Sequence, residues 1–155
     1  MKPSALALST ILLAGAPAHA ATYDLTPDGN ARYLADFAAK PGVVKLPDGV
    51  MYRVVQAGDG HGVSPIARFD IVYAQYKGWT VDGHVFDATK GAPLRFEAGG
   101  VIQGWTDVLM KMKTGDEWQV VIPAKYGYGA EGRPPVIPPD QTLVFLIKLE
   151  KVEYP

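Results

Sequence analysis

The sequence contains no cysteine and only three histidines. Disulfides and cysteine nucleophiles are therefore excluded. His61 and Ser64 share a glycine-rich loop, but no oriented acid or oxyanion donors accompany them, so we interpret this loop as a surface turn. His61 and His84 are the only histidines beyond the first twenty residues, and no carboxylates stand beside them at ligand spacing. Because no phosphate-binding glycine loop is present either, we expect neither a metal nor a cofactor.

The charge of the chain is nearly balanced, with 15 basic and 16 acidic residues. Removal of the first twenty residues would remove only Lys2, lowering the basic count from 15 to 14. Such a balance provides no positive field for nucleic acid or for an anionic membrane surface. We therefore expect no nucleic-acid partner.

The first twenty residues have the pattern of a secretory signal peptide. Lys2 is followed by an apolar run over residues 5–16 and then by Ala18-His19-Ala20, a small-residue cleavage site. A membrane-spanning helix needs about 20 apolar residues, and Pro17 ends this run too early. We predict cleavage after Ala20 and export of residues 21–155 without a membrane anchor, since no cysteine is available for lipidation.

Residues 21–45 are expected to form a short helix and a linker. Thr26 followed by Pro27 is typical of a helix N-cap and first turn, and Pro41-Gly42 is a stop signal, which predicts a helix over residues 27–40. Leu34, Phe37 and Ala38 fall on one face of it. This narrow apolar stripe must pack on the main domain or on a second copy of the chain.

From residue 46 onward, short apolar segments alternate with glycine, proline and Asp-Gly turn signals. One segment, Gly104–Met112, has apolar residues at helical spacing and is followed by Gly115. A hairpin turn is predicted at residues 81–84. A single helix against an antiparallel sheet is an α+β fold, and we assign residues 46–155 to one such domain. The predicted strands are Met51–Gln56, Arg68–Trp79, Val85–Asp87, Leu94–Glu97, Glu117–Ile122 and Thr142–Val152.

Four motifs follow one another between Tyr76 and Phe145: YKGWTVDGHVFDAT, VIQGW, YGYGAEGRPPVIPP and TLVF. In this order and spacing they resemble the FKBP-type (tacrolimus-binding) peptidyl-prolyl cis-trans isomerases over residues 46–152. The preceding stretch, NARYLADFAAKPGVVKLPDGVMYRVV, resembles the exported macrophage infectivity potentiator branch. The resemblance implies an FKBP-like sheet wrapped around one short helix, proline-containing polypeptide clients, binding of tacrolimus-like macrolides and a periplasmic location, with secretion as an alternative.

The resemblance also implies a role for each motif residue. Trp105 would form the floor of a proline pocket, and Tyr128 and the main-chain amide of Ile102 would bind substrate carbonyls. Val136 and Ile137 would lie in a loop that overhangs the pocket. Without the motif order, these aromatic residues would be read as ordinary core residues, and the proline-rich stretch 133–139 as a ligand for a partner domain. The pocket walls would be Tyr76, Phe86, Phe96, Val101, Ile102 and Phe145.

Asp87 is the one residue of this predicted pocket that carries a charge. A buried carboxylate requires a hydrogen-bond donor, and we expect the Tyr76 hydroxyl to fill that role. The family often has an arginine in the next loop, whereas residues 88–92 form a shorter loop that offers only Lys90. Two further departures are Leu94, where an aromatic residue is frequent, and Arg133, where histidine is common.

The resemblance predicts an enzyme that accelerates X-Pro isomerisation during the folding of exported proteins. We expect catalysis by desolvation and orientation of the prolyl amide, with Asp87 acting electrostatically. A peptide-binding chaperone of the same fold without turnover is the main alternative. A third possibility is an interaction protein that acts through the helix at residues 27–40. We expect a monomer, or a weak dimer formed through that helix.

Overall fold

The structure is a computed structural model that describes residues 22–155. The predicted signal peptide, residues 1–20, lies outside the described residues. The elements in chain order are α1 (Pro27–Ala38), β1 (Val44–Lys45), β2 (Met51–Gln56), β3 (Ile71–Thr80), β4 (Val85–Ala88), β5 (Leu94–Glu97), α2 (Gln103–Leu109), β6 (Glu117–Ile122), a 3₁₀ turn (Ala124–Tyr126) and β7 (Leu143–Glu153).

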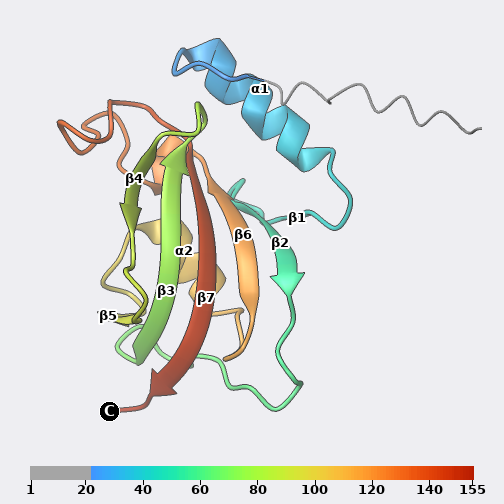
Figure 1. The fold of residues 1–155 in the computed structure, drawn as a ribbon, viewed down its shortest axis with the longest axis vertical. Helices are drawn as coiled ribbons and strands as arrows, with labels where there is room; N and C mark the ends of the chain where they lie inside the picture. Colours follow the sequence, from blue (N-terminus) through green and yellow to red (C-terminus); the bar gives the residue numbers. More distant parts are fainter. Residues whose placement is uncertain (1–21) are drawn as a thin grey trace, which may run out of the picture.

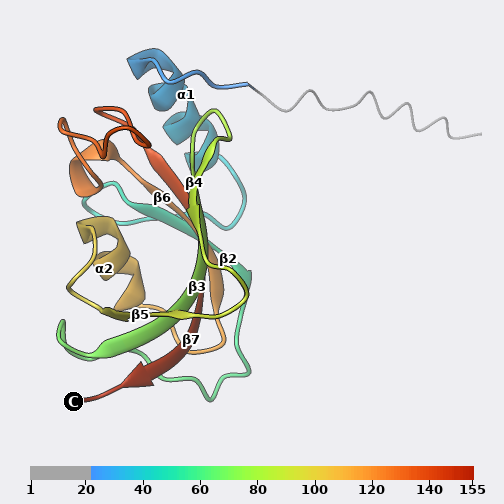
Figure 2. The ribbon, with the colours of Figure 1, turned by 60° about the vertical axis from the view of Figure 1, so that its left-hand side comes forward.

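The strands form one antiparallel sheet in the order β1-β2-β6-β7-β3-β4, and β5 also pairs with β3. The long strands β3 and β7 pair along the whole length of β3 and form the middle of the sheet. The sheet curves around α2, which lies on its concave side (Figures 1 and 2). This architecture confirms the α+β prediction of a sheet wrapped around a short helix.

The main core lies between α2 and the concave face of the sheet. Trp105, Val108, Leu109 and Met112 are all at most 4% exposed, as their helical spacing predicts. The helix ends at Leu109, earlier than predicted, and Met112 reaches the core from the turn that follows. Burial of these side chains fixes α2, and with it Trp105, against the sheet.

A second, smaller core lies on the opposite face of the sheet. Neighbouring residues of a strand point to opposite faces, so Val120 packs toward α2 whereas Val121 packs toward α1. Phe37 of α1 is 1% exposed in this second core. Helix α1 therefore rests on the sheet of its own chain. Ala38, predicted to share this face, is exposed at the last position of the helix.

The start of α1 follows the sequence prediction. Thr26 is the N-cap, its hydroxyl accepts a 3.1 Å hydrogen bond from the Gly29 N–H, and Pro27 occupies the first turn. The helix ends at Ala38, two residues before the predicted Lys40. Strand β1 begins shortly afterwards and pairs with β2. This two-residue strand was not predicted, because so short a segment carries no periodicity.

Strand β3 begins at Ile71 and not at the predicted Arg68. The Asp70 carboxylate accepts hydrogen bonds from the main-chain N–H groups of Ile66 and Ala67, at 2.7 and 2.8 Å, and closes a turn there. The predicted hairpin turn at residues 81–84 is confirmed, with Gly83 at a φ of 87°. The boundary between linker and domain at residue 45 stays a prediction.

Candidate functional site

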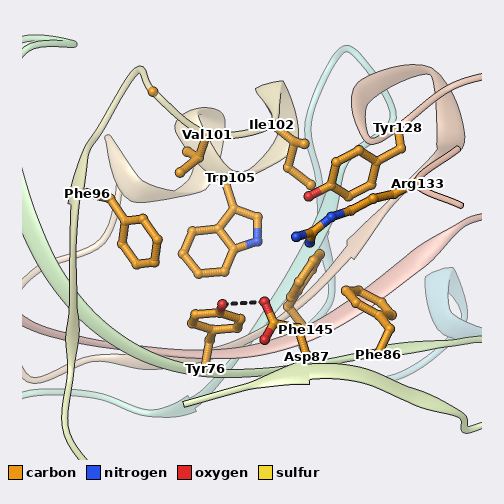
Figure 3. A pocket seen from close by; sticks show the side chains of 11 residues that line it. Tyr76, Phe86, Asp87, Phe96, Val101, Ile102, Trp105, Tyr128, Arg133 and Phe145 are labelled. Carbon is orange, nitrogen blue, oxygen red and sulfur yellow. Dashed lines mark hydrogen bonds between the residues drawn. The ribbon is translucent and has the colours of Figure 1, made fainter. Parts of the chain in front are cut away.

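A cavity of about 340 Å³ opens between α2, the concave face of the sheet and the loop that follows the 3₁₀ turn. Its walls are mostly aromatic, and the side chains come from β3, β4, β5, the start of α2, the loop after the 3₁₀ turn and β7, converging on the centre of the cavity (Figure 3). The lining residues are Tyr76, Phe86, Asp87, Phe96, Gly100, Val101, Ile102, Trp105, Tyr128, Arg133 and Phe145.

Trp105, in the first turn of α2, forms the floor of this cavity. The rings of Tyr76 and Phe145 stand edge-on to its indole, with centroid distances of 5.0 and 5.4 Å and interplanar angles of 89°. Edge-to-face packing of this kind is favourable and restricts ring rotation. Gly104 allows α2 to approach the sheet, because a Cβ atom there would lie 2.5 Å from Ile122 Cγ2. The depth of the floor therefore depends on a glycine.

Gly78, near the C-terminal end of β3, has a comparable effect on one wall. A Cβ atom at this position would lie 2.6 Å from Phe145 Cε1 and 2.8 Å from Phe86 Cζ. These two rings instead meet edge-to-face at 5.6 Å directly over the glycine. Glycine inside a strand often marks such a close approach, a signal that our sequence analysis did not use.

Asp87 lies on β4 and is held by Tyr76, as predicted. The Tyr76 hydroxyl donates a 2.5 Å hydrogen bond to Asp87 Oδ2 (Figure 3). Burial of the Tyr76 hydroxyl is the largest cause that raises its pKa, and the hydrogen bond to Asp87 and the charge of Asp87 raise it further. The phenol therefore remains a donor at any physiological pH, and the carboxylate keeps a fixed position on the cavity wall.

The short loop after β4 is closed by Thr89. Its main-chain N–H donates to the Tyr76 carbonyl oxygen at 2.9 Å, and its hydroxyl oxygen accepts from the Tyr76 N–H at 3.1 Å. Lys90 is exposed and does not line the cavity. Leu94 is 48% exposed and is also absent from the lining. The cation at this cavity is Arg133, which approaches from the opposite side.

The rim of the cavity carries the polar groups that face a ligand. The hydroxyl of Tyr128 and the guanidinium of Arg133 both point toward the middle of the cavity (Figure 3). Ile102 is the N-cap residue of α2, and its carbonyl oxygen accepts from the Trp105 N–H at 3.0 Å. Its own N–H makes no hydrogen bond within residues 22–155, so it remains available to a ligand carbonyl.

The structure brings nine of the eleven residues predicted for the pocket to the cavity. The two exceptions are Ile137, which is 1% exposed within the main core, and Val136, which is 40% exposed and outside the lining. Reciprocal main-chain hydrogen bonds with Arg133 direct Ile137 inward, so that Arg133 faces the cavity in its place. Sequence reasoning assigned neither Arg133 nor Gly100 to the pocket.

A second hollow, of about 640 Å³, lies elsewhere and is more open and more polar. It includes His61 but not Ser64, whose carbonyl oxygen accepts a hydrogen bond from the Tyr154 hydroxyl. This arrangement agrees with our interpretation of the loop as a surface turn. Across residues 22–155, no group of three or more His, Asp or Glu side chains is placed to bind a metal ion. Neither described helix has the length and hydropathy of a membrane span.

Comparison with known proteins gives concordant matches. The sequence model of the family "FKBP-type peptidyl-prolyl cis-trans isomerase" matches residues 63–150. The outer membrane protein MIP of Legionella longbeachae is 38% identical over 123 residues, which cover 78% of this chain and 52% of that protein. The isomerase FkpA of Escherichia coli is 42% identical over 78% of this chain and 44% of its own length. The chain thus spans about half the length of the curated relatives it matches.

Two solved structures have the same fold. A peptidyl-prolyl cis-trans isomerase from Pseudomonas syringae pv. tomato superposes with a TM-score of 0.76 at 37% identity, over 82% of this chain and 92% of that one. FkpA from Escherichia coli gives a TM-score of 0.75 at 41% identity, over 81% of this chain and 58% of that one. The matched residues include every segment that lines the aromatic cavity, from Tyr76 to Phe145. The chain therefore belongs to the family of FKBP-type peptidyl-prolyl cis-trans isomerases.

Proposed function

We propose that this protein catalyses cis-trans isomerisation of X-Pro peptide bonds in polypeptide clients, in the aromatic cavity above Trp105. The observation that carries the proposal is the composition of this cavity. It has an indole floor, edge-on aromatic walls and one carboxylate, Asp87, fixed by a phenol. Among residues 22–155, the lining of this site contains no serine, threonine or cysteine side chain, but it can desolvate and orient an amide.

X-Pro isomerisation needs only what this cavity provides. Rotation about the C–N bond breaks no covalent bond but must overcome a barrier of about 18–20 kcal/mol, which arises from amide resonance. The twisted amide is less dipolar than the planar one. An apolar, water-poor site therefore stabilises the transition state relative to the ground state. The proline ring would lie on Trp105, between Tyr76, Phe86, Phe96 and Phe145.

The polar groups of the rim would hold the substrate backbone. We expect the free N–H of Ile102 and the hydroxyl of Tyr128, which points into the cavity, to donate to carbonyl oxygens on either side of the twisted bond. Asp87 would act through its charge, because its Oδ2 already accepts a hydrogen bond from Tyr76. No proton transfer is required in this scheme. We therefore expect a pH-rate profile that is flat near neutrality.

We further propose that the clients are exported polypeptides in the periplasm. The proposal is supported by the signal-like residues 1–20, with Lys2, an apolar run and Ala18-His19-Ala20. Uncatalysed prolyl isomerisation takes tens to hundreds of seconds, which is long enough to delay folding after export. Tacrolimus-like macrolides would compete for the same cavity.

We also propose that residues 21–155 are monomeric at low concentration. Most of the apolar stripe of α1 is covered within the chain, since Phe37 packs against Met51, Val121 and Val144 and Leu34 packs against the same cluster. Little of that stripe is left for a second copy. Sedimentation equilibrium of residues 21–155 tests this proposal, and a dimer that persists at nanomolar concentration would contradict it.

The central experiment measures isomerisation of short Xaa-Pro peptides by residues 21–155, with and without tacrolimus. We expect acceleration that tacrolimus abolishes, and a large loss of turnover with retained fold in Asp87→Leu. Lys90→Ala is the matched control, because Lys90 lies in the adjacent loop but outside the cavity. Absence of acceleration across several residues before proline, by protein that still binds the peptides, would instead support the peptide-binding chaperone.

A further inference from the structure

Arg133 is fixed in place by the backbone of its own loop. Its N–H donates to the Ile137 carbonyl oxygen at 2.8 Å, and the Ile137 N–H donates back to the Arg133 carbonyl oxygen at 2.9 Å. Gly132 precedes it at a φ of 62°, where a Cβ atom would lie 2.5 Å from the Ile137 oxygen. Because Ile137 is anchored in the core at 1% exposure, this tight turn holds the Arg133 Cα at the cavity rim.

The side chain of Arg133 extends from this turn over the mouth of the cavity. Its guanidinium carbon lies 5.9 Å from the centroid of the Tyr128 ring, a favourable cation–π position. From there the guanidinium points toward the space above Phe145 and Asp87 (Figure 3). Its positive charge acts on groups inside the cavity. It lowers the pKa of Tyr76 and so partly offsets the rise that burial and Asp87 cause.

The charge of Arg133 has no acidic partner in the described part of the chain. The ion pair found among residues 22–155 joins Lys151 and Glu153, away from the cavity. Asp87, the one carboxylate in the cavity lining, is engaged by the Tyr76 hydroxyl. The guanidinium therefore presents unpaired hydrogen-bond donors in the direction from which a ligand must enter.

We propose that Arg133 forms a subsite for an acidic side chain next to the substrate proline. The inference rests on the proposed isomerase function and adds a sequence preference to it. A planar guanidinium binds a carboxylate through two parallel hydrogen bonds, which an ammonium group cannot reproduce. Because Arg133 is exposed, we expect a modest preference of about two- to fivefold in kcat/KM at low salt.

The test uses two peptide series, with Glu, Gln or Lys placed directly before the proline in one series and directly after it in the other. Residues 21–155 should turn over the Glu peptide about two- to fivefold faster than the Gln peptide in at least one series. Added salt should reduce that ratio, because Arg133 is exposed to screening. The ratio should fall to one in Arg133→Gln, and Arg133→Glu should favour the Lys peptide.

Lys125→Gln provides the matched control. Lys125 also lies over a tyrosine, at 5.5 Å from the centroid of the Tyr126 ring, but it is outside the cavity lining. The control removes the same charge from the molecule and should keep the Glu/Gln ratio of the wild type. A ratio of one in both wild-type series, or a ratio that survives in Arg133→Gln, would overturn the subsite while leaving the isomerase function intact. Failure to accelerate even the Gln peptides would overturn both.

Discussion

The side-chain oxygen of Asn30, on α1, accepts a 2.8 Å hydrogen bond from the main-chain N–H of Thr142, which is 112 positions away in the sequence. The amide nitrogen of Asn30 also donates to Gln141 Oε1 at 3.2 Å. All three residues are at most 6% exposed. This contact joins the N-terminal helix to the segment that leads from the cavity loop into β7.

Replacement of Asn30 by alanine should destabilise the protein by about 1–3 kcal/mol, because it leaves buried polar groups of Gln141 and Thr142 without partners. The direction of this change in the free energy of unfolding is informative, because alanine has the higher helix propensity and the same substitution at an exposed helix position would be favourable. Urea unfolding of Asn30→Ala measures the loss. The control Ala31→Asn places the same side chain on an exposed neighbour and should cost no more than about 0.7 kcal/mol. Equal stability of Asn30→Ala and wild type would refute the contact's role.

The hydrogen bond between Tyr76 and Asp87 predicts a distinct alkaline behaviour. Burial first, and then the hydrogen bond and the charge of Asp87, hold the pKa of Tyr76 above its usual value. Because the pKa of Tyr76 is higher in the folded than in the unfolded protein, Tyr76 contributes to the free energy of unfolding. This contribution is complete below the pKa of an unfolded tyrosine, about 10, and is lost as pH rises through the folded pKa. Stability should therefore fall above about pH 10, and less steeply in Tyr76→Phe.

Unfolding midpoints measured from pH 8 to 11 test this expectation. Asp87→Asn serves as a partial control, because it removes the charge but leaves the burial of Tyr76. Its alkaline slope should lie between those of wild type and Tyr76→Phe. If wild type and Tyr76→Phe lose stability in parallel, the tyrosine is not coupled to folding in this way.

Periodicity and turn signals were sufficient to predict much of the fold. Helix α2 was predicted from the spacing of Trp105, Val108, Leu109 and Met112, and all four are buried. The predicted ends of the elements were less accurate, because local side-chain hydrogen bonds determine where an element begins. The Asp70 carboxylate closes a turn just before β3, so the strand begins later than predicted. No pattern in a single sequence reports such a local hydrogen bond.

The site was predicted mainly through motif resemblance, and its exceptions have a structural cause. Val136 and Ile137, two neighbouring apolar residues, were both expected near the pocket. The hydrogen-bonded turn between Arg133 and Ile137 instead leaves Arg133 facing the cavity, and neither apolar residue lines it. Asn30 was missed for a related reason. A polar residue on a short helix is normally solvated, and its burial depends on partners more than a hundred positions later.

Gly78 leaves room for two rings of the cavity wall, and this close approach predicts the effect of adding a methyl group there. In Gly78→Ala, the new Cβ atom would displace the rings of Phe86 and Phe145, which it would otherwise approach within 3 Å. Overpacking of this kind costs about 1–3 kcal/mol, and displaced walls should lower kcat/KM by about tenfold or more. Lys77→Ala, at the adjacent exposed position, should leave both properties near wild type. Unchanged turnover in Gly78→Ala would show that the ring positions do not limit the reaction.

Asp107 of α2 predicts a stabilising substitution. Its Oδ1 accepts a 2.7 Å hydrogen bond from Gln103, whereas its Oδ2 is buried and has no partner among residues 22–155. Burial first, and then the neighbouring Asp48, raise the pKa of this carboxyl group, against smaller opposing effects of Gln103 and Arg68. The fold therefore disfavours the ionised form of Asp107.

Asp107→Asn should raise the unfolding midpoint at pH 7, because the amide can still accept from Gln103 and can donate toward Asp48. A raised folded pKa means that the stability linked to protonation of Asp107 is complete below the unfolded pKa, about 3.9, and is lost as pH rises through the folded value. The advantage of the variant should thus shrink as pH falls toward about 4.

A double variant tests the repulsion between the two carboxyl groups. Stability should increase less in Asp48→Asn combined with Asp107→Asn than the sum of the two single changes, since each change relieves the same repulsion. Lower stability of Asp107→Asn at pH 7 would mean that the carboxylate has a compensating role that its present contacts do not account for.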